Sequence, residues 1–221
     1  MSIVDQGLLG PARELLPEVV DLRRDLHVHP ELGLGTSGGG RLSSVVADLQ
    51  GGRPGPTILL RGDMDALPMT EDTGLDFASS TGDTMHACGH DAHTAMLVGA
   101  ARLLAARRED LPGRVRFMFQ PGEEGSGGAA LMIDDGVVDG VDGAFAIHVA
   151  PNVPAGIVAW RSGPALASAD ELEVVVTGRG GHASTPHWAT DPVPAACELV
   201  LALQAMVTRT VDVFDPAVLT I

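Results

Sequence analysis

One cysteine and three histidines lie within eight positions of the segment TMHACGHDAHTAMLVGA, residues 84–100. Thiolate and imidazole are ligands that zinc and similar first-row divalent ions favour. We therefore predict that Cys88 and His90 bind metal, the alternative being a buried cysteine beside a helix-capping histidine. The start of the helix that follows is expected to favour a thiolate at Cys88. His86 and His93 are weaker candidates, because histidines at a helix start are often only solvated or hydrogen-bonded to a neighbour.

More polar side chains follow predicted strands at their carboxyl ends. They are Asp63 and Asp65 after TILLR, Glu123 and Glu124 after VRFMFQ, and His148 after AFAI. Open α/β sheets build their sites at this edge. Adjacent side chains in an extended segment point to different sides, so one glutamate could bind metal while the other handles protons. The alternatives are a solvated acidic turn for the two glutamates and, for His148, a histidine in the core whose ring nitrogens are hydrogen-bonded.

The elements that must position these residues alternate between helix and strand. Leu15, Val19, Leu22 and Leu26 have helical spacing and predict a helix over 11–27. SVVADL and TILLR read as neighbouring strands around the turn QGGRPGP. Further along we expect a helix from His90 to about Arg108, a strand in RVRFMFQ, a short helix in GGAALMIDDG and a buried strand in GAFAIHV. This alternation predicts an α/β sheet.

The pattern changes near residue 162. ELEVVVTGRGGHAS predicts a strand and a turn, PVPAACELVLALQAMVTRT a helix that starts at prolines, and AVLTI the beginning of another strand. We therefore place a domain boundary between residues 162 and 163. Within the first domain, the glycine- and serine-rich segment over 33–44 predicts a flexible loop.

Composition excludes several classes of function. The chain of 221 residues carries 14 Lys and Arg against 29 Asp and Glu, a net charge of −15, which argues against nucleic acid or an anionic membrane as partner. Its N-terminal sequence lacks the pattern of a signal peptide, so we expect a cytoplasmic protein. Two cysteines far apart in the sequence do not suggest a disulfide framework.

Six motifs, taken in order, carry a resemblance to a known family. They are HPELG, RGDMDALPM, MHACGHDAHTAMLVGAA, FQPGEEGSGGA, IHVAPNVPAG and GRGGHASTPH. They resemble the amidohydrolase branch of the aminoacylase and carboxypeptidase metallopeptidases, which includes hippurate hydrolases and indole-acetyl-amino-acid hydrolases. The resemblance implies an α/β fold with a mixed central sheet flanked by helices, as in zinc exopeptidases. It makes 1–162 the catalytic metal-binding domain and 163–221 part of an α+β lid and dimerisation domain.

The resemblance also implies roles for the matching residues. Cys88, His90, Glu124 and His148 resemble the ligands of a two-metal site that takes Zn, Mn, Co or Ni, with Cys88 bridging the ions. Glu123 resembles the general base that takes a proton from the attacking water. Asp65 resembles an acidic residue that orients the ligands. His182 resembles the lid histidine that stabilises the oxyanion, in such dimers often from the partner subunit. Its alternative is an ordinary exposed histidine of a turn.

The chain also departs from this family. Relatives continue past the strand that AVLTI begins and supply a further metal-binding histidine, whereas no histidine follows His187 here. Relatives also carry an extra helix and strand where this chain has only residues 33–44. We therefore interpret the chain as truncated at its C-terminus and shortened internally, with the second metal site incomplete.

These observations lead to one main hypothesis and two alternatives. The main hypothesis is metal-dependent hydrolysis of N-acyl-amino acids such as hippurate. The expected partners are this small-molecule substrate and a second copy of the chain, in a homodimer formed through the lid domain. The first alternative is a dipeptidase or carboxypeptidase of the same superfamily. The second is a catalytically inactive remnant that binds metal or dimerises.

Overall fold

The computed structural model describes residues 6–34, 43–163, 165–166, 170–212, 214 and 217–221. Most of the predicted flexible loop over 33–44 lies outside these residues. The chain forms two compact units, Met1–Ala155 and Gly156–Ile221. None of the described helices is long and apolar enough to cross a membrane.

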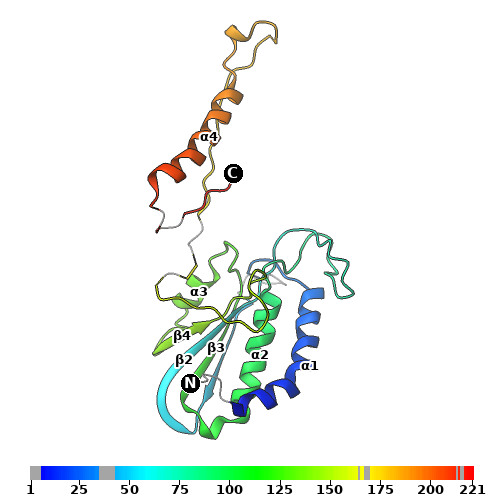
Figure 1. Cartoon of the computed structure of the whole chain (residues 1–221), viewed down its shortest axis with the longest axis vertical. Coiled ribbons are helices and arrows are strands. Elements are labelled where there is room, and N and C mark those ends of the chain that lie inside the picture. The colour runs from blue at the N-terminus through cyan, green and yellow to red at the C-terminus, as the bar shows by residue number, and fades with distance from the viewer. Residues whose placement is uncertain (1–5, 35–42, 164, 167–169, 213, 215–216) are drawn as a thin grey trace. The chain divides into compact units, whose positions relative to one another are not determined.

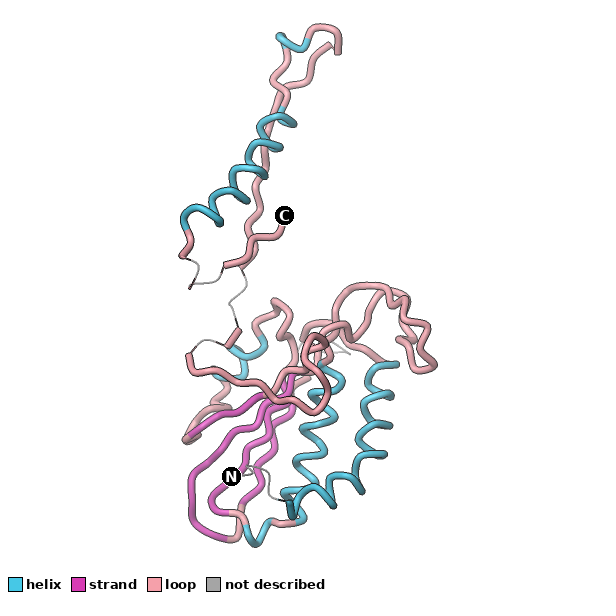
Figure 2. The backbone as a smooth tube through the Cα atoms, in the orientation of Figure 1, coloured by secondary structure: helices cyan, strands magenta, loops and turns pink. Residues whose placement is uncertain are grey.

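A four-stranded mixed sheet forms the centre of the first unit (Figures 1 and 2). Its strands are β1 (Val45–Gln50), β2 (Arg53–Asp63), β3 (Pro112–Gln120) and β4 (Gly143–Ala146). The order is β1-β3-β2-β4; β2 runs parallel to both β3 and β4, and β1 runs antiparallel to β3. The predicted mixed sheet of an α/β fold is confirmed.

The prediction that β1 and β2 are neighbouring strands is wrong. Only two residues, Gly51 and Gly52, join them, yet β3 lies between the two strands. The N–H of Gly51 donates to the carbonyl of Gly113 at 2.8 Å, and that of Arg53 donates to the carbonyl of Leu111 at 3.2 Å. The start of β3 therefore takes the hydrogen bonds that would otherwise close a hairpin.

Helices cover both faces of this sheet. α1 (Gln6–Val28) packs on α2 (His90–Ala106), and α2 packs on β2 and β3. Gly62 of β2 allows α2 to come close, since a Cβ atom there would lie 3.1 Å from the carbonyl oxygen of His93. On the opposite face, Leu59 and Met118 form a buried cluster with Met132 of α3 (Gly128–Asp134). Alternate residues of a strand point to opposite faces of the sheet, so Leu59 faces α3 whereas Gly62 faces α2.

β4 is an exposed edge strand, which corrects the prediction that GAFAIHV is buried. It pairs with β2 on one side, and within the described residues no further strand pairs with its other side. Phe145 is accordingly 56% exposed. A run of apolar residues shows that a segment is hydrophobic. Whether that segment is buried depends on which other element covers it.

The second unit is organised around α4 (Pro192–Thr210), whose bounds match the predicted helix. Asp191 caps this helix by accepting from the N–H of Val193 at 3.0 Å. The predicted strands at 171–176 and 217–221 are not strands among the described residues. In the described part of the second unit, β pairing is limited to an isolated bridge between Arg179 and Thr190. A strand requires a hydrogen-bonded partner, which sequence propensity does not supply. Two 3₁₀ turns complete the described elements of the chain, Arg108–Asp110 in the first unit and Pro186–Trp188 in the second.

Candidate metal centre

The predicted site residues of the first unit meet at the carboxyl ends of three parallel strands. Asp63 is the last residue of β2, and Asp65 lies two residues beyond it. β3 ends at Gln120 and β4 at Ala146, shortly before the two glutamates and His148 respectively. Because β2 is parallel to both of its neighbours, these three chain ends lie at one edge of the sheet. The polar residues that follow these three strands are therefore brought together.

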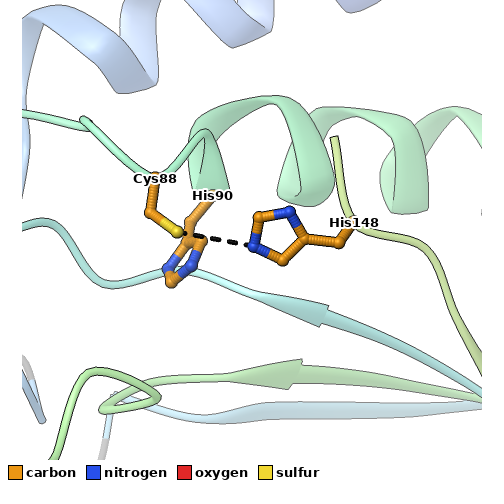
Figure 3. Close-up of side chains that lie close together, drawn as sticks. All are labelled: Cys88, His90 and His148. Atoms are coloured by element: carbon orange, nitrogen blue, oxygen red, sulfur yellow. Dashed lines mark hydrogen bonds between the residues drawn. The ribbon is translucent and has the colours of Figure 1, made fainter. Parts of the chain in front are cut away.

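Cys88, His90 and His148 converge at this edge, although they come from two separate segments (Figure 3). The Sγ atom of Cys88 lies 3.4 Å from Nε2 of His148. One ligand atom from each of the three residues can be chosen so that all lie within 4.8 Å of one another. This spacing suits a single cation held between a sulfur and two ring nitrogens.

Gly89 makes the sharp turn between the two ligand candidates that precede and begin α2. Its φ of +85° lies in the left-handed region, which glycine adopts without a steric penalty. A Cβ atom at this position would also lie 2.4 Å from Cγ2 of Val149. The bare Cα of Gly89 therefore lets the segment that carries His148 approach the start of α2.

His90 is fully buried, and neither of its ring nitrogens makes a hydrogen bond within the described part of the chain. Carboxylates surround it: Nδ1 lies 3.3 Å from Asp65, and Nε2 lies 3.7 to 4.0 Å from Asp63, Glu124 and Glu123. Burial alone would lower the pKa of His90, but the nearby Asp65 and Asp63 raise it overall. Buried ring nitrogens that face carboxylates without making a hydrogen bond fit a site for a divalent metal, because imidazole and carboxylate are both metal ligands.

Asp65 holds the segment with the two glutamates in place. Its two carboxylate oxygens accept from the backbone N–H groups of Glu123 and Glu124, each at 3.0 Å. Burial alone would raise the pKa of Asp65, but its pairing with His90 and these two N–H groups lower it, so the orienting group stays ionised. Asp65 thus fixes both glutamates beside His90.

The environment of Cys88 corrects the expectation of a ready-made thiolate. Burial is the largest cause that raises the pKa of the Cys88 thiol to about 12, followed by a hydrogen bond with Glu124 and by nearby carboxylates. These effects outweigh the helix N-terminus that follows Cys88. A metal that binds here must displace the thiol proton.

Asp63 and His93 form a contact that the sequence did not reveal. Nδ1 of His93 lies 2.5 Å from Oδ1 of Asp63, and both side chains are buried. Arg61 forms an ion pair with the other oxygen of Asp63 at 2.6 Å. The only signal in the sequence was the position of His93 three residues after His90, which places both on one side of a helix.

His86 lies apart from the ligand groups that can be chosen among the described residues. It is buried, its Nδ1 has no hydrogen-bond partner, and its ring centroid is 6.2 Å from that of His27. Burial is the largest cause that lowers the pKa of His86 to about 4. His86 is therefore neutral at pH 7 and belongs to a second buried cluster beside the site.

That second cluster was also missed from the sequence, and it joins α1, the start of α2 and the loop between β2 and α2. Buried His27 reaches Asp91 with Nδ1 at 2.7 Å and Glu71 with Nε2 at 3.2 Å. Arg23 pairs with the same oxygen of Asp91 at 2.7 Å. Asp91 is fully buried and directly follows His90, so this ion cluster anchors the segment that carries the metal-ligand candidates.

We expect the bonds to Glu71 to make the protein sensitive to acid. Burial alone would raise the pKa of Glu71, but bonds from Thr73, the N–H of Ser79 and His27 lower it from 4.5 to about 2. The unfolded state therefore binds the proton first, so stability that is present above pH 4.5 is lost as the pH falls towards about 2. Urea denaturation followed by far-UV circular dichroism over this range should show a smaller loss in Glu71→Gln than in the wild type.

Glu14 provides the matched control, because its side chain is exposed on α1. Glu14→Gln should follow the wild-type dependence on pH. If Glu71→Gln instead lost stability with acid as steeply as the wild type, Glu71 would not be a source of this sensitivity.

His182 lies in the second unit and is exposed. Its Nδ1 is 2.8 Å from Oγ of Ser184, and its carbonyl accepts from Thr185. The predicted contact of His182 with a substrate stays a prediction.

Most of the chain is similar to known proteins. Residues 59–218 match the model of the peptidase family M20/M25/M40. An N-acetylcysteine deacetylase of Bacillus subtilis is 41% identical over 92% of this chain and 58% of its own length. Thermostable carboxypeptidase 1 of Saccharolobus solfataricus is 38% identical over 100% of this chain and 61% of its own length. The chain thus spans about three fifths of the length of these relatives.

Solved structures show the same fold. A dinuclear metal binding peptidase from the M20 family of Bacillus subtilis is 40% identical, with a TM-score of 0.61 over 64% of this chain and 45% of that chain. A protein from methicillin-resistant Staphylococcus aureus is 36% identical, with a TM-score of 0.72 over 96% of this chain and 59% of that chain.

Proposed function

This chain belongs to the peptidase family M20/M25/M40, and from that premise we propose that it hydrolyses the amide bond of N-acyl-amino acids in a metal-dependent reaction. The observation that carries the proposal is the convergence of Cys88, His90 and His148 beside two glutamates. A deacetylase among the relatives supports an acyl-amino acid as substrate. Hippurate-like compounds are the proposed substrate class.

Cys88, His90, Glu124 and His148 are the residues that would hold the metal. A set of sulfur, nitrogen and oxygen donors suits Zn, Mn, Co or Ni. The dinuclear centre named for the structural relative supports two ions. When bound, such ions polarise the substrate carbonyl and lower the pKa of a water molecule.

The chain's own residues would handle the proton and hold the geometry. Glu123 is more exposed than Glu124, at 41% against 28% of the side chain, and the bond between Glu124 and Cys88 draws Glu124 towards the ligands. Glu123 is therefore the proposed base, which takes a proton from the attacking water and passes it to the leaving amine. Asp65 orients both glutamates through their N–H groups.

Part of the proposal concerns the second unit and the cellular location of the protein. His182 is proposed to stabilise the oxyanion from the lid, and residues 163–221 to form a homodimer. Exposed apolar side chains on α4, including Leu201 at 70% exposure, support an interface there. A cytoplasmic location is also proposed, since both cysteines of the chain are free.

A carboxypeptidase or dipeptidase is the second candidate, and the carboxypeptidase among the relatives favours it. A free dipeptide carries an α-amino group that requires an acceptor in the site, whereas an acyl chain does not. Parallel assays of benzoyl-glycine, acetyl-amino acids and free dipeptides decide between the two, because the proposed activity predicts the higher kcat/KM for the acylated substrates.

The first test is metal content per chain together with hydrolysis of a benzoyl- or acetyl-amino acid. We expect bound metal and turnover that a chelator abolishes and added metal restores. Purified protein that takes up no metal and shows no turnover would contradict the proposal and favour the inactive remnant. The matched control is Cys197→Ser. Cys197 is an exposed cysteine of α4, so its loss should change neither the metal content nor the rate of hydrolysis.

A further inference from the structure

His93 occupies a position between three chain segments of the first unit. It lies on α2, its Nδ1 faces the carboxylate at the end of β2, and its Nε2 accepts from the backbone N–H of Val149 at 2.9 Å. Its side chain is only 2% exposed. Both ring nitrogens are therefore engaged inside the protein.

The two contacts define which nitrogen carries the proton. An N–H group can only donate, so the N–H of Val149 requires a lone pair on Nε2 of His93. The ring proton must then lie on Nδ1, from which it is donated to Asp63 at 2.5 Å. The arrangement selects the neutral ring with one defined tautomer.

Asp63 anchors this ring to the sheet. The carboxylate is paired with Arg61 at 2.6 Å, and Arg61 donates through Nε to Gln120 of β3 at 2.9 Å. Through Arg61, the carboxylate of Asp63 is thus fixed to its own strand and to β3, so His93 presents Nε2 from a rigid support.

Val149 directly follows His148, which lies beyond the end of β4 and is exposed. The sheet ladder therefore does not hold His148. Instead, the backbone of Val149 is bonded to His93, and its side chain lies against the bare Cα of Gly89. The rings of His93 and His148 also meet edge to face, with centroids 4.6 Å apart.

We propose that His93 and Asp63 are positioning residues that hold His148 towards Cys88 through the backbone of Val149. This inference rests on the proposed function, since it gives His148 the role of a metal ligand. Asp63, His90 and His93 could instead form a metal site of their own, because their ligand atoms lie close together. That reading is less favourable, since Asp63 and Val149 already occupy both nitrogens of His93 and Arg61 is paired with Asp63.

The test compares His93→Leu with His93→Gln. A leucine side chain makes neither bond, whereas a glutamine amide can donate to Asp63 and accept from Val149. Thr94→Val is the matched control, because it removes another buried hydrogen bond between α2 and Asp63 without touching Val149. Circular dichroism of each full-length variant checks that it is folded.

Two readouts are needed. In the metal-free protein, hydrogen exchange at the Val149 amide should be slow in the wild type, His93→Gln and Thr94→Val, and fast in His93→Leu. In a cobalt titration followed by thiolate-to-cobalt absorption, His93→Leu should bind about 10–100-fold more weakly than wild type. His93→Gln should recover most of that affinity, and Thr94→Val should bind cobalt as the wild type does.

The outcomes separate this inference from the proposed function. Wild-type cobalt affinity in His93→Leu, or an unchanged Val149 amide, would overturn the positioning role. If the wild type bound no cobalt, the proposed function would fail, and the Val149 amide would still decide whether His93 holds this segment. Should His93→Leu not fold, Val149→Pro removes the donor while leaving the His93 and Asp63 bond; it should weaken cobalt binding by a similar factor, and wild-type affinity would overturn the inference.

Discussion

Replacing Glu123 with glutamine is expected to lower kcat for hydrolysis of an N-acyl-amino acid by about 10²–10⁴-fold. Glutamine keeps the shape of the side chain and the backbone N–H that Asp65 holds, but it cannot take up a proton. Metal content should therefore stay at the wild-type level while turnover is lost. Steady-state kinetics on metal-loaded protein, with metal analysis of the same samples, measures both quantities.

Glu124→Gln is the matched control for this prediction. Its backbone N–H is held by the same carboxylate at the same distance of 3.0 Å, so the two variants differ only in the side chain that is changed. Because Glu124 is the proposed ligand, its loss should lower metal affinity as well as turnover. Intact hydrolysis in Glu123→Gln, or loss of metal from that variant alone, would show that the roles of the two glutamates are assigned wrongly.

Asp91→Ala is expected to lower the free energy of unfolding of the metal-free protein by about 3–5 kcal/mol. Asp91 is fully buried and pairs with both His27 and Arg23, so its removal leaves the buried His27 ring and the Arg23 guanidinium without their carboxylate partner. Because Asp91 and its partners lie in the first unit, the loss of stability is expected in that unit. Both tryptophans of the chain, Trp160 and Trp188, lie in the second unit, so urea denaturation should be followed by far-UV circular dichroism instead of tryptophan fluorescence.

An ion pair on the same two helices provides the comparison. Glu18 of α1 pairs with Arg102 of α2, but both side chains are more than half exposed. Exposed pairs contribute little, so Glu18→Gln should cost less than about 1 kcal/mol. If Asp91→Ala were no more destabilising than Glu18→Gln, the buried cluster would not be a source of stability.

Local patterns in the sequence predicted several elements correctly. α4 begins at the prolines and ends where expected, α2 begins at His90, and the short helix after β3 is followed by Gly136 in a left-handed conformation. Such features depend on helical spacing, capping and turn residues within a few positions of one another. They need no partner from elsewhere in the chain, so the sequence contains the information directly.

Features that need a distant partner were predicted poorly. The insertion of β3 between β1 and β2 depends on which backbone finds which partner, and neither strand's own residues specify it. The exposure of Phe145 depends on what covers β4. Residues 171–176 have strand propensity, but within the described chain they pair with no other segment.

The sequence by itself determined the chemistry of the site: soft ligands before one helix, and carboxylates and a histidine just beyond strand ends. Only the tertiary structure decided how these groups are held. It paired His93 with Asp63 across 30 positions and His27 with Asp91 across 64, and it set Cys88 among carboxylates that raise the pKa of its thiol to about 12. The physical reason is that hydrogen bonding and desolvation depend on distances of a few ångströms, which are fixed when strands pair and helices pack.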